Sequence, residues 1–347
     1  MLQPVLRSAL TALAVAAVAA TLAPAASASI APTMSLSPST ATAGSTANLT
    51  IDLQFSNTGT DSPKDLTLNL PAGLLANAAI DGGACLQTAD TSSKSPCKIG
   101  SGTVTATADP VGLLNVPVPV SVPVSFYLVP PPARGDLAGL AVEGLGEQIG
   151  STGEIRIRPT GDPDGVGVTL KLALPNQFPL TLPIVGKVNA AQISLTEIDS
   201  TFDSLRYPAT CPSPAQRLSV SADSYKDPSV QTTSAALNVT RCSSLPYSPT
   251  FKATATRDSG DRQVKLTTTV IQAATEAPSR SVSLAFPAAT LAPNLESIRA
   301  LCLNLASGTC PTVGSATADS PLYPTPLTGT AYLTGSSSGL ALTLVFP

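Results

Sequence analysis

The chain has 347 residues, of which 19 are lysine or arginine and 22 are aspartate or glutamate, so its formal net charge is −3. It contains no histidine, which excludes Ser-His-Asp and Cys-His catalytic arrangements and histidine-ligated metal sites. The slight acidity, the absence of a basic cluster and an aromatic content of 4% also speak against nucleic-acid binding.

The first 28 residues have the pattern of a cleaved export signal. Arg7 is their only charged residue, residues 9–20 are rich in alanine and leucine, and residues 26–28 read Ala-Ser-Ala, the small-residue pattern that signal peptidase recognises. A membrane anchor is the alternative, but a spanning helix needs about 20 apolar residues, and Pro24 interrupts this run. We expect a mature chain without a membrane span that is secreted or extracellular, with cell-wall association as a further expectation.

The remaining sequence predicts strands separated by turns. The 33 prolines and 24 glycines interrupt any long helix. Val264 and Leu266 alternate with Lys265 and Thr267, which is typical of a strand with one buried face. Strands are predicted over residues 47–55, 65–70, 102–108, 154–158, 166–174, 192–198, 217–222, 235–239, 250–256, 263–270, 280–286 and 339–345. Short strands at this spacing predict an all-β fold of tandem antiparallel, Ig-like β-sandwich modules.

Two local features complete the prediction of secondary structure. Short helical turns are expected at residues 73–79 and 294–301. The apolar segment 116–129 contains Pro117, Pro119 and Pro123, which cannot donate backbone hydrogen bonds. We expect it to be an edge strand protected by proline, and the alternative is an exposed strand that associates with itself or with the cell wall.

One part of the sequence recurs about 215 residues further on. Residues 65–72 (DLTLNLPA) and 99–109 (IGSGTVTATAD) return as residues 281–288 (SVSLAFPA) and 313–319 (VGSATAD), with a cysteine pair inside each copy. The match continues more loosely from Phe-Tyr-Leu at 126–128 to Ala-Tyr-Leu at 331–333. Because proline, cysteines and glycine keep nearly the same offset, we expect a duplicated module.

The duplication predicts the order of modules. After the signal peptide (1–28), we expect a β-sandwich repeat module at 29–145, a middle β module at 146–245 and a second copy of the repeat module at 246–347. Residues 244–249 (SLPYSP) predict a stiff junction, since a residue before proline is held extended. The second copy ends where the first passes into the middle module, so it is expected to be either a natural half-unit or an incomplete one.

Six cysteines form three neighbouring pairs in the sequence. Disulfides are expected for Cys85 with Cys97, Cys211 with Cys242, and Cys302 with Cys310. Six cysteines allow fifteen connectivities, and local pairing is favoured because the duplicated pair recurs as a unit. Zinc is the alternative, but the chain has neither histidine nor a Cys-x-x-Cys motif. Disulfides agree with the oxidising compartment that the export signal implies.

Acidic residues are the remaining candidates for a site. Asp162 and Asp164, and separately Asp258 and Asp261, supply oxygens on turns that could bind Ca²⁺; hairpin turns are the alternative. Paired carboxylates could hydrolyse glycosides, and the following acids lie in or beside the middle module: Glu143, Glu147, Glu154, Asp162, Asp164, Glu197, Asp199 and Asp203. Solvated acids on turns and edges are the preferred interpretation, because no tryptophan is present to stack on sugars. No cofactor is expected.

Several runs of residues resemble large repetitive secreted proteins of actinobacteria. They include residues 224–227 (SYKD), 237–249 (LNVTRCSSLPYSP), 281–287 (SVSLAFP) and 327–333 (LTGTAYL). The resemblance covers most of the mature chain, and its best-matched part is 208–335. The chain departs from the family pattern after Cys97, where Lys98 stands at the position of the family's proline. The resemblance implies β-rich modules in an extracellular or cell-envelope protein, and it carries no catalytic or binding residues.

These observations together predict a secreted structural or interaction protein of the bacterial envelope, without catalytic activity. Its expected partners are cell-wall or surface components, with self-association as a further possibility. The alternative is an extracellular binding module for a small apolar or carbohydrate ligand, seated in a groove between modules. An enzyme ranks third, because no histidine is present to exchange protons near neutral pH.

Overall fold

The fold is given by a computed structural model of the chain. It describes residues 30–56, 61–109, 118–161, 165–182, 186–257, 264–273, 276–277, 279, 301–302, 304–320, 325–336 and 339–346. The predicted export signal (1–28) and the strand at 280–286 lie outside the described residues. So does the helical turn at 294–301, except for Leu301, which lies in a strand.

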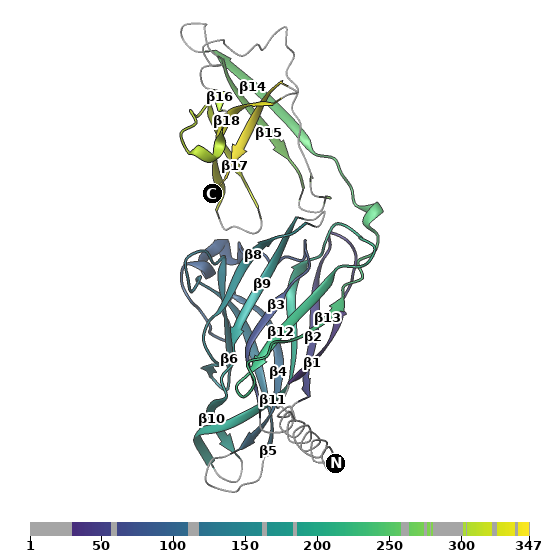
Figure 1. The fold of residues 1–347 in the computed structure, drawn as a ribbon, viewed down its shortest axis with the longest axis vertical. Coiled ribbons are helices and arrows are strands. Elements are labelled where there is room, and N and C mark those ends of the chain that lie inside the picture. Colours follow the sequence, from purple (N-terminus) through teal and green to yellow (C-terminus); the bar gives the residue numbers. More distant parts are fainter. Residues whose placement is uncertain are drawn as a thin grey trace, which may run out of the picture.

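The described residues form strands joined by turns, with three short 3₁₀ helices (Figure 1). The strands that belong to the largest sheet are β1 (Ala31–Pro38), β2 (Thr46–Ser56), β3 (Pro63–Asn69), β4 (Lys98–Asp109), β5 (Val118–Val129), β6 (Ala138–Gly144), β7 (Glu147–Gln148), β8 (Gly153–Pro159), β9 (Val166–Ala173), β10 (Gln177–Leu182), β11 (Gly186–Arg206), β12 (Arg217–Ser224) and β13 (Gln231–Ala236). The helices are η1 (Ile80–Leu86), η2 (Cys242–Ser244) and η3 (Leu305–Ser307). The expected all-β class is confirmed.

The largest sheet is antiparallel and nearly closed on itself. Its order is β1-β2-β11-β4-β5-β6-β8-β9-β3-β12-β13, and the two end strands, β1 and β13, contact each other. Figure 1 shows these strands wrapping around one long axis. We call this sheet the barrel. The barrel differs from the tandem Ig-like sandwiches that the sequence predicted. β11 lies between β2 and β4, and β12 pairs with β3, so strands far apart in the chain share one sheet.

The barrel thus combines strands from two of the predicted modules. Strands on both sides of residue 145 share it, since β6 pairs with β8 and β9 pairs with β3. The boundaries at 145 and 245 stay predictions. β11, which lies far from β2 and β4 in the sequence, joins these two strands in the sheet. The pattern of residues within each short strand does not predict such long-range pairing.

Alternating side chains give the barrel its interior. In β2, Leu49, Ile51, Leu53 and Phe55 are each at most 4% exposed, while the residues between them are more exposed. Each such side chain contributes about 1.5 to 3 kcal/mol when it is fully buried. A slip of one residue against β1 or β11 would turn all four outward, so this pattern fixes the register.

Strand β5 explains how the prolines of segment 116–129 fit into a sheet. Residues 118–123, with Pro119 and Pro123, pair with β4 alone. Residues 124–127 pair with both β4 and β6, and residues 128–129 pair with β6. The prediction of an edge strand therefore holds for the proline-containing half. The other half is an interior strand, because its N–H groups are free to pair on both sides.

All three predicted disulfides are present. Cys85–Cys97 joins η1 to the start of β4, with a Cα–Cα distance of 5.5 Å, and both residues are buried. The remaining pairs are Cys211–Cys242 and Cys302–Cys310, with Cα–Cα distances of 5.9 and 5.1 Å. In the chain-entropy model each bond stabilises by about 2 to 4 kcal/mol. The predicted turn at 73–79 is not helical; the 3₁₀ helix lies just after it, at η1.

Two smaller sheets follow the barrel in the chain. β14 (Thr250–Arg257) and β15 (Val264–Ile271) form a hairpin. β16 (Leu301–Cys302), β17 (Gly314–Ala318), β18 (Leu327–Ser336) and β19 (Gly339–Val345) form a four-stranded sheet in which β18 is central. We call residues 250–346 the C-terminal module; it lies at the upper end of the barrel in Figure 1.

Tyr207 gives the fold a predictable response to alkaline pH. Its side chain is 1% exposed, its hydroxyl donates to the Asn48 carbonyl at 3.2 Å, and burial raises its pKa to about 12. In the unfolded chain the Tyr207 hydroxyl ionises at about pH 10. Between pH 10 and about pH 12 only the unfolded state releases this proton, so the free energy of unfolding should fall by at most about 3 kcal/mol as the pH rises. Tyr207→Phe should flatten this fall in urea unfolding curves measured from pH 9 to pH 12.

The control for this prediction is Tyr247→Phe, at a side chain that is 54% exposed. This variant should follow the wild-type curve. An identical alkaline slope for Tyr207→Phe and wild type would show that Tyr207 is not the group responsible.

Candidate functional site

The barrel encloses an apolar cavity of about 340 Å³ near one of its ends. Most of its lining is apolar, and only Phe202 among these apolar residues is aromatic: Ile51, Leu68, Leu70, Ala76, Ala78, Ile80, Ile99, Leu128, Leu137, Ala138, Leu140, Ile155, Val168, Leu170, Phe202 and Leu205. These side chains come from η1, from adjoining loops and from eight strands of the barrel, namely β2, β3, β4, β5, β6, β8, β9 and β11. The cavity exists because an eleven-strand circuit is wider than the eight-strand barrel whose interior side chains can just fill.

A second cavity of about 80 Å³ continues the first along the barrel. It is lined by side chains such as Leu53, Val104, Val122, Ile149, Leu172, Leu195 and Ile198. Ile51, Leu68, Leu170 and Phe202 line both cavities, so these four residues form the boundary between them. The two spaces together make one apolar interior divided at a narrow point.

An aromatic pair lies at this boundary. The rings of Phe126 on β5 and Phe202 on β11 have centroids 5.1 Å apart and are tilted by 34°. Such pairs contribute about 0.5 to 1.5 kcal/mol beyond their burial. Phe126 lines only the smaller cavity, whereas Phe202 lines both. Phe202 therefore determines how far an occupant of the larger cavity can extend.

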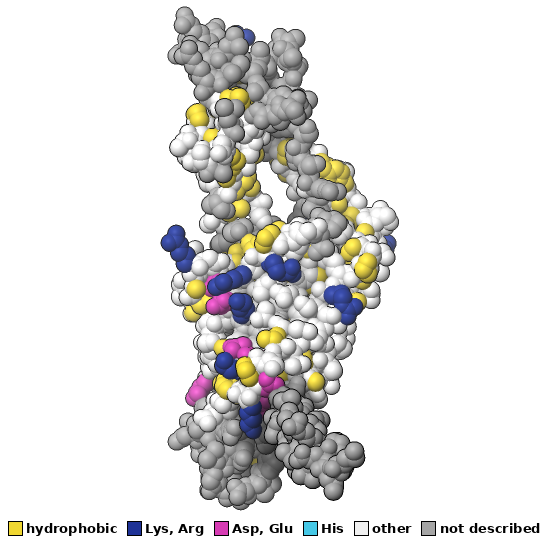
Figure 2. All heavy atoms as spheres, in the orientation of Figure 1, with side chains coloured by type: hydrophobic (Ala, Val, Ile, Leu, Met, Phe, Trp, Pro, Cys, Tyr) yellow, Lys and Arg dark blue, Asp and Glu magenta, His cyan; other side chains and the backbone are white. Residues whose placement is uncertain are grey.

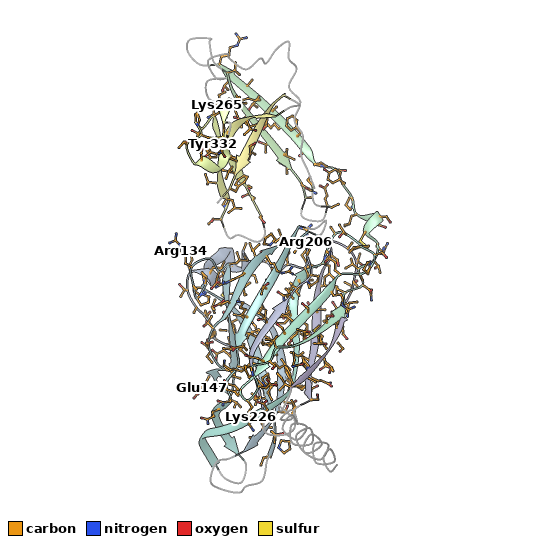
Figure 3. The ribbon with its side chains drawn as sticks, viewed as in Figure 1. Arg134, Glu147, Arg206, Lys226, Lys265 and Tyr332 are labelled. Atoms are coloured by element: carbon orange, nitrogen blue, oxygen red, sulfur yellow. A yellow bond between two sulfur atoms is a disulfide. The ribbon has the colours of Figure 1, made fainter. Side chains whose placement is uncertain are left out.

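Polar side chains occur at one end of the larger cavity, which we call the mouth. Asn77, Lys98, Asp203 and Ser204 line it, and all four are exposed to solvent. The backbone N–H of Ser204 donates to the Asn48 side chain at 3.1 Å, which holds the end of β11. The cavity opens to solvent at these residues, because they contact both. Figure 3 labels Arg206, the last residue of β11, at the upper end of the barrel near the C-terminal module.

A partly buried ion pair fixes the loop beside the mouth. The Arg156 guanidinium contacts the Asp136 carboxylate at 2.5 Å and Glu154 at 3.1 Å, and the side chain of Asp136 is 0% exposed. Asp136 also accepts a hydrogen bond from the Ala133 N–H at 3.1 Å. The hydrogen bond and charge of Asp136 raise the pKa of Arg156. This loop leads directly into Leu137 and Ala138 of the cavity wall.

A polar cluster lies near the smaller cavity, at the other end of the barrel. Asp61, 2% exposed, accepts hydrogen bonds from the N–H groups of Ser62 and Lys226 and from the Ser224 hydroxyl, at 2.9, 3.2 and 2.6 Å. The Ser62 hydroxyl in turn accepts from the N–H of Leu195, which lines the smaller cavity. Figure 3 places Lys226 at the lower end, opposite Arg206. The cluster joins β3, β11 and β12 beside the smaller cavity.

Among the predicted acidic site residues that the structure describes, only Asp203 lines this cavity. Of the calcium candidates, Asp162, Asp164, Asp258 and Asp261 all lie outside the described residues. The part of the chain that the structure describes contains no cluster of three metal-ligating side chains. Asp203 reaches the mouth, while Glu143, Glu147 and Glu154 lie on β6, β7 and β8, and Glu197 and Asp199 on β11. The six cysteines all form disulfides.

Comparisons with known proteins give no relative from which a function could be transferred, so a function is argued from the geometry of the cavity alone. No family model matches the chain, and no curated protein or solved structure is significantly similar to it. Among the described residues, no helix is both long and apolar enough to cross a membrane.

Sequence reasoning missed the cavity because its wall consists of ordinary core residues. Ile51 and Leu170 have the same alternating pattern that a filled core would show. Only the number of strands in the circuit determines whether such side chains meet in the middle, and that number depends on long-range pairing.

Proposed function

We propose that this protein binds one extended apolar molecule, of the size of an acyl chain, inside the barrel. The observation that supports this most is the 340 Å³ aliphatic cavity with exposed polar residues at only one described end. The binding-module alternative from the sequence is thus preferred to a purely structural role, and the site moves from a groove between modules to the barrel interior.

The volume favours a chain of moderate length. Since an apolar cavity of about 150 Å³ can hold benzene, the 340 Å³ cavity has room for roughly 14 carbon atoms. Ligand pockets of drug-sized molecules measure about 300 to 1,000 Å³. A steroid-sized or two-chain lipid needs more space than one such cavity offers, so a single linear chain is the better fit.

The polarity of the lining orients the ligand. The wall beyond the mouth offers aliphatic and aromatic surface, so a charged group placed there would lose its hydration without compensation. Lys98 and Asp203 at the mouth supply a cation, an anion and hydrogen-bonding groups. We therefore propose that the apolar tail lies deep in the barrel and that a polar head, such as a carboxylate, remains at the mouth beside Lys98.

Export supports this role. An apolar molecule that crosses an aqueous space outside the cytoplasm needs a soluble protein to cover it, and three disulfides are consistent with an extracellular location. We propose that the protein is secreted by its signal peptide and that it consists of two related copies joined by a middle module. Association with the cell wall would place the carrier where envelope lipids are exchanged.

The experiment uses the mature chain, residues 29–347, produced by export so that its disulfides form. Saturated fatty acids of 8 to 18 carbons compete with a fluorescent fatty acid, and each affinity is measured. Because each methylene contributes about 0.8 kcal/mol, removing two carbons should weaken binding about 15-fold, for chains up to the roughly 14 carbons that fill the cavity. Absence of competition by any fatty acid or by the matching alcohols would refute the proposal.

Phe202 should set the length limit. Phe202→Ala removes the ring that lines both cavities, so the interior of about 340 Å³ gains access to the further 80 Å³. The preferred chain should lengthen by about two to four carbons, with little change for shorter chains. The same competition assay, run on both proteins, checks this.

The matched control is Phe251→Ala, at a side chain on β14 that is 55% exposed. It should leave the length preference unchanged. An unchanged preference in Phe202→Ala would mean that the occupant does not reach the boundary between the cavities.

A further inference from the structure

Four consecutive residues of β11 line the larger cavity, which a regular strand does not allow. All of residues 202–205 belong to the lining, whereas neighbouring side chains of a regular strand point to opposite faces of the sheet. Ser200 and Phe202 line the interior with even numbers, and Leu205 lines it with an odd number. The inward face of β11 therefore changes between Phe202 and Leu205.

A β-bulge causes this change. The pairing of β11 with β2 shifts between Phe202 and Leu205, so that Asp203 and Ser204 both lie opposite Asn48. The φ angle of Ser204 is 54°, in the left-handed region that residues other than glycine seldom adopt. Bulges are frequent beside functional sites, where they redirect a side chain. In a regular strand the residue after Phe202 would point out of the barrel, so the bulge is the reason why Asp203 reaches the mouth.

Asn48 holds the bulge in place. Its side-chain oxygen accepts a hydrogen bond from the Ser204 N–H at 3.1 Å. The main chain of Asn48 is itself fixed, because its N–H donates to the Ser39 hydroxyl at 3.0 Å. Its carbonyl accepts hydrogen bonds from the Ser39 N–H at 2.9 Å and from the Tyr207 hydroxyl at 3.2 Å. Asn48 is therefore a positioning residue, which holds Ser204 in its left-handed conformation and so directs Asp203.

Lys98 lies at the same level of the barrel as the bulge. The pairing of β11 with β4 ends at Phe202 and Gly100, and Lys98 comes two residues before Gly100 in the antiparallel strand. Lys98 and Asp203 both line the mouth. Among the residues that the structure describes, neither of them forms an ion pair. The mouth thus offers a ligand one cation and one anion.

The charges around the mouth indicate what the head of the ligand carries. On the face that Figure 2 shows, dark blue lysine and arginine side chains gather on the upper half of the barrel, below the C-terminal module. The mouth lies at this end, next to Arg206 (Figure 3), so an anionic head is attracted there. Asp203 opposes this attraction, because it repels a carboxylate that lies beside Lys98.

A hydroxyl group on the ligand offsets this repulsion. It donates a hydrogen bond to the Asp203 carboxylate, and hydrogen bonds to a charged acceptor are stronger than those between neutral groups. An ammonium group would donate as well, but it would lie near the positive charge of Lys98. A neutral donor close to the carboxylate of the ligand therefore fits the mouth best.

We propose that the ligand of the barrel is a hydroxy fatty acid with its hydroxyl on the second or third carbon. The hydroxyl donates to Asp203, the carboxylate lies beside Lys98, and the tail fills the larger cavity. This inference rests on the proposed binding of an acyl chain and adds the chemistry of its head. The bulge at Asp203 and Ser204, held by Asn48, gives the site this specificity.

The experiment compares three acids with the same tail: tetradecanoic acid, 2-hydroxytetradecanoic acid and 3-hydroxytetradecanoic acid. Each competes with a fluorescent fatty acid for the mature chain. The better of the two hydroxy acids should bind about five- to tenfold more tightly than tetradecanoic acid, which corresponds to one additional hydrogen bond. Asp203→Ala should abolish this preference, and Asp203→Asn should keep part of it, because its amide oxygen still accepts. The matched control is Asp199→Ala, at an exposed position of the same strand, which should keep the wild-type preference.

Variants of Asn48 test the role of the bulge. Asn48→Ala should reduce the preference for the hydroxy acid, whereas Asn48→Asp should restore it, because its side-chain oxygen again accepts from Ser204. A purely structural role would lower the melting temperature and leave the ratio of the affinities unchanged. Equal binding of all three acids by wild type, or a preference that survives Asp203→Ala, would overturn this inference alone. Absence of competition by any of the three acids would overturn the proposed function as well.

Discussion

Ala138→Phe should abolish the retention of an acyl-chain ligand while the protein stays folded. Ala138 is 1% exposed and lies in the wall of the larger cavity, so a phenyl ring at this position occupies space that the ligand needs. Displacing only two methylenes weakens binding about 15-fold, at about 0.8 kcal/mol for each. The folded state tolerates the ring because the 340 Å³ cavity receives it. Titration with a fluorescent fatty acid and thermal unfolding measure the two effects separately.

Ala236→Phe is the matched control for this substitution. Ala236 is the last residue of β13 and is exposed, so the added ring does not enter the barrel. Its affinity should equal that of wild type. Wild-type affinity in a folded Ala138→Phe protein would contradict binding in the larger cavity.

Asp61→Ala should destabilise the protein more than any surface substitution. The change leaves the N–H groups of Ser62 and Lys226 without the carboxylate that accepts their hydrogen bonds, while the Ser224 hydroxyl keeps only the Asp227 carbonyl at 3.1 Å. Each buried donor that loses its acceptor costs about 1 to 3 kcal/mol, so a loss of about 3 kcal/mol or more is expected. Urea unfolding of the mature chain at neutral pH measures it.

The comparison for Asp61 is Asp65→Ala. Asp65 contacts Lys64 at 3.0 Å with 54% of its side chain exposed. Water and salt screen such surface pairs, so the unfolding midpoint of this variant should remain close to that of wild type. Equal midpoints for both variants would show that the Asp61 cluster does not join the strands as its geometry indicates.

Local features of the sequence predicted the local features of the structure. The strands predicted at 217–222 and 166–174 correspond to β12 and β9, because alternation of apolar side chains is enough to recognise a half-buried strand. The pairing of neighbouring cysteines also followed from the sequence, since the duplicated pair recurs as a unit. Both predictions depend only on residues close together in the chain.

Long-range pairing could not be predicted from the same patterns. β11 was recognised only in part, at 192–198, and nothing in its sequence shows that it lies between β2 and β4. Its position changes separate sandwiches into one nearly closed barrel. The expectation of a buried face for residues 263–270 likewise fails for β15: Val264 and Val270 are exposed, and β15 pairs only with β14 among the strands that the structure describes.

The candidate site exists only because the sheet closes into a barrel, and the sequence patterns did not predict that closure. Phe202 was not recognised as a site residue, since an aromatic side chain on a strand is normally part of a packed core. Asp203, one position further, was considered as a carboxylate for glycoside hydrolysis and instead lines the mouth of an apolar cavity. The sequence places both residues on one strand, and only the barrel gives them their neighbours.

A crystal structure of the mature chain with 12-bromododecanoic acid tests the central claim most directly, because bromine marks the end of the chain by its anomalous scattering. Binding in the barrel predicts a single bromine peak beside Phe202, Ile51 and Leu170, with the carboxylate at the mouth near Lys98. A bromine peak only on the outer surface, or a water-filled cavity at saturating ligand, would contradict the account.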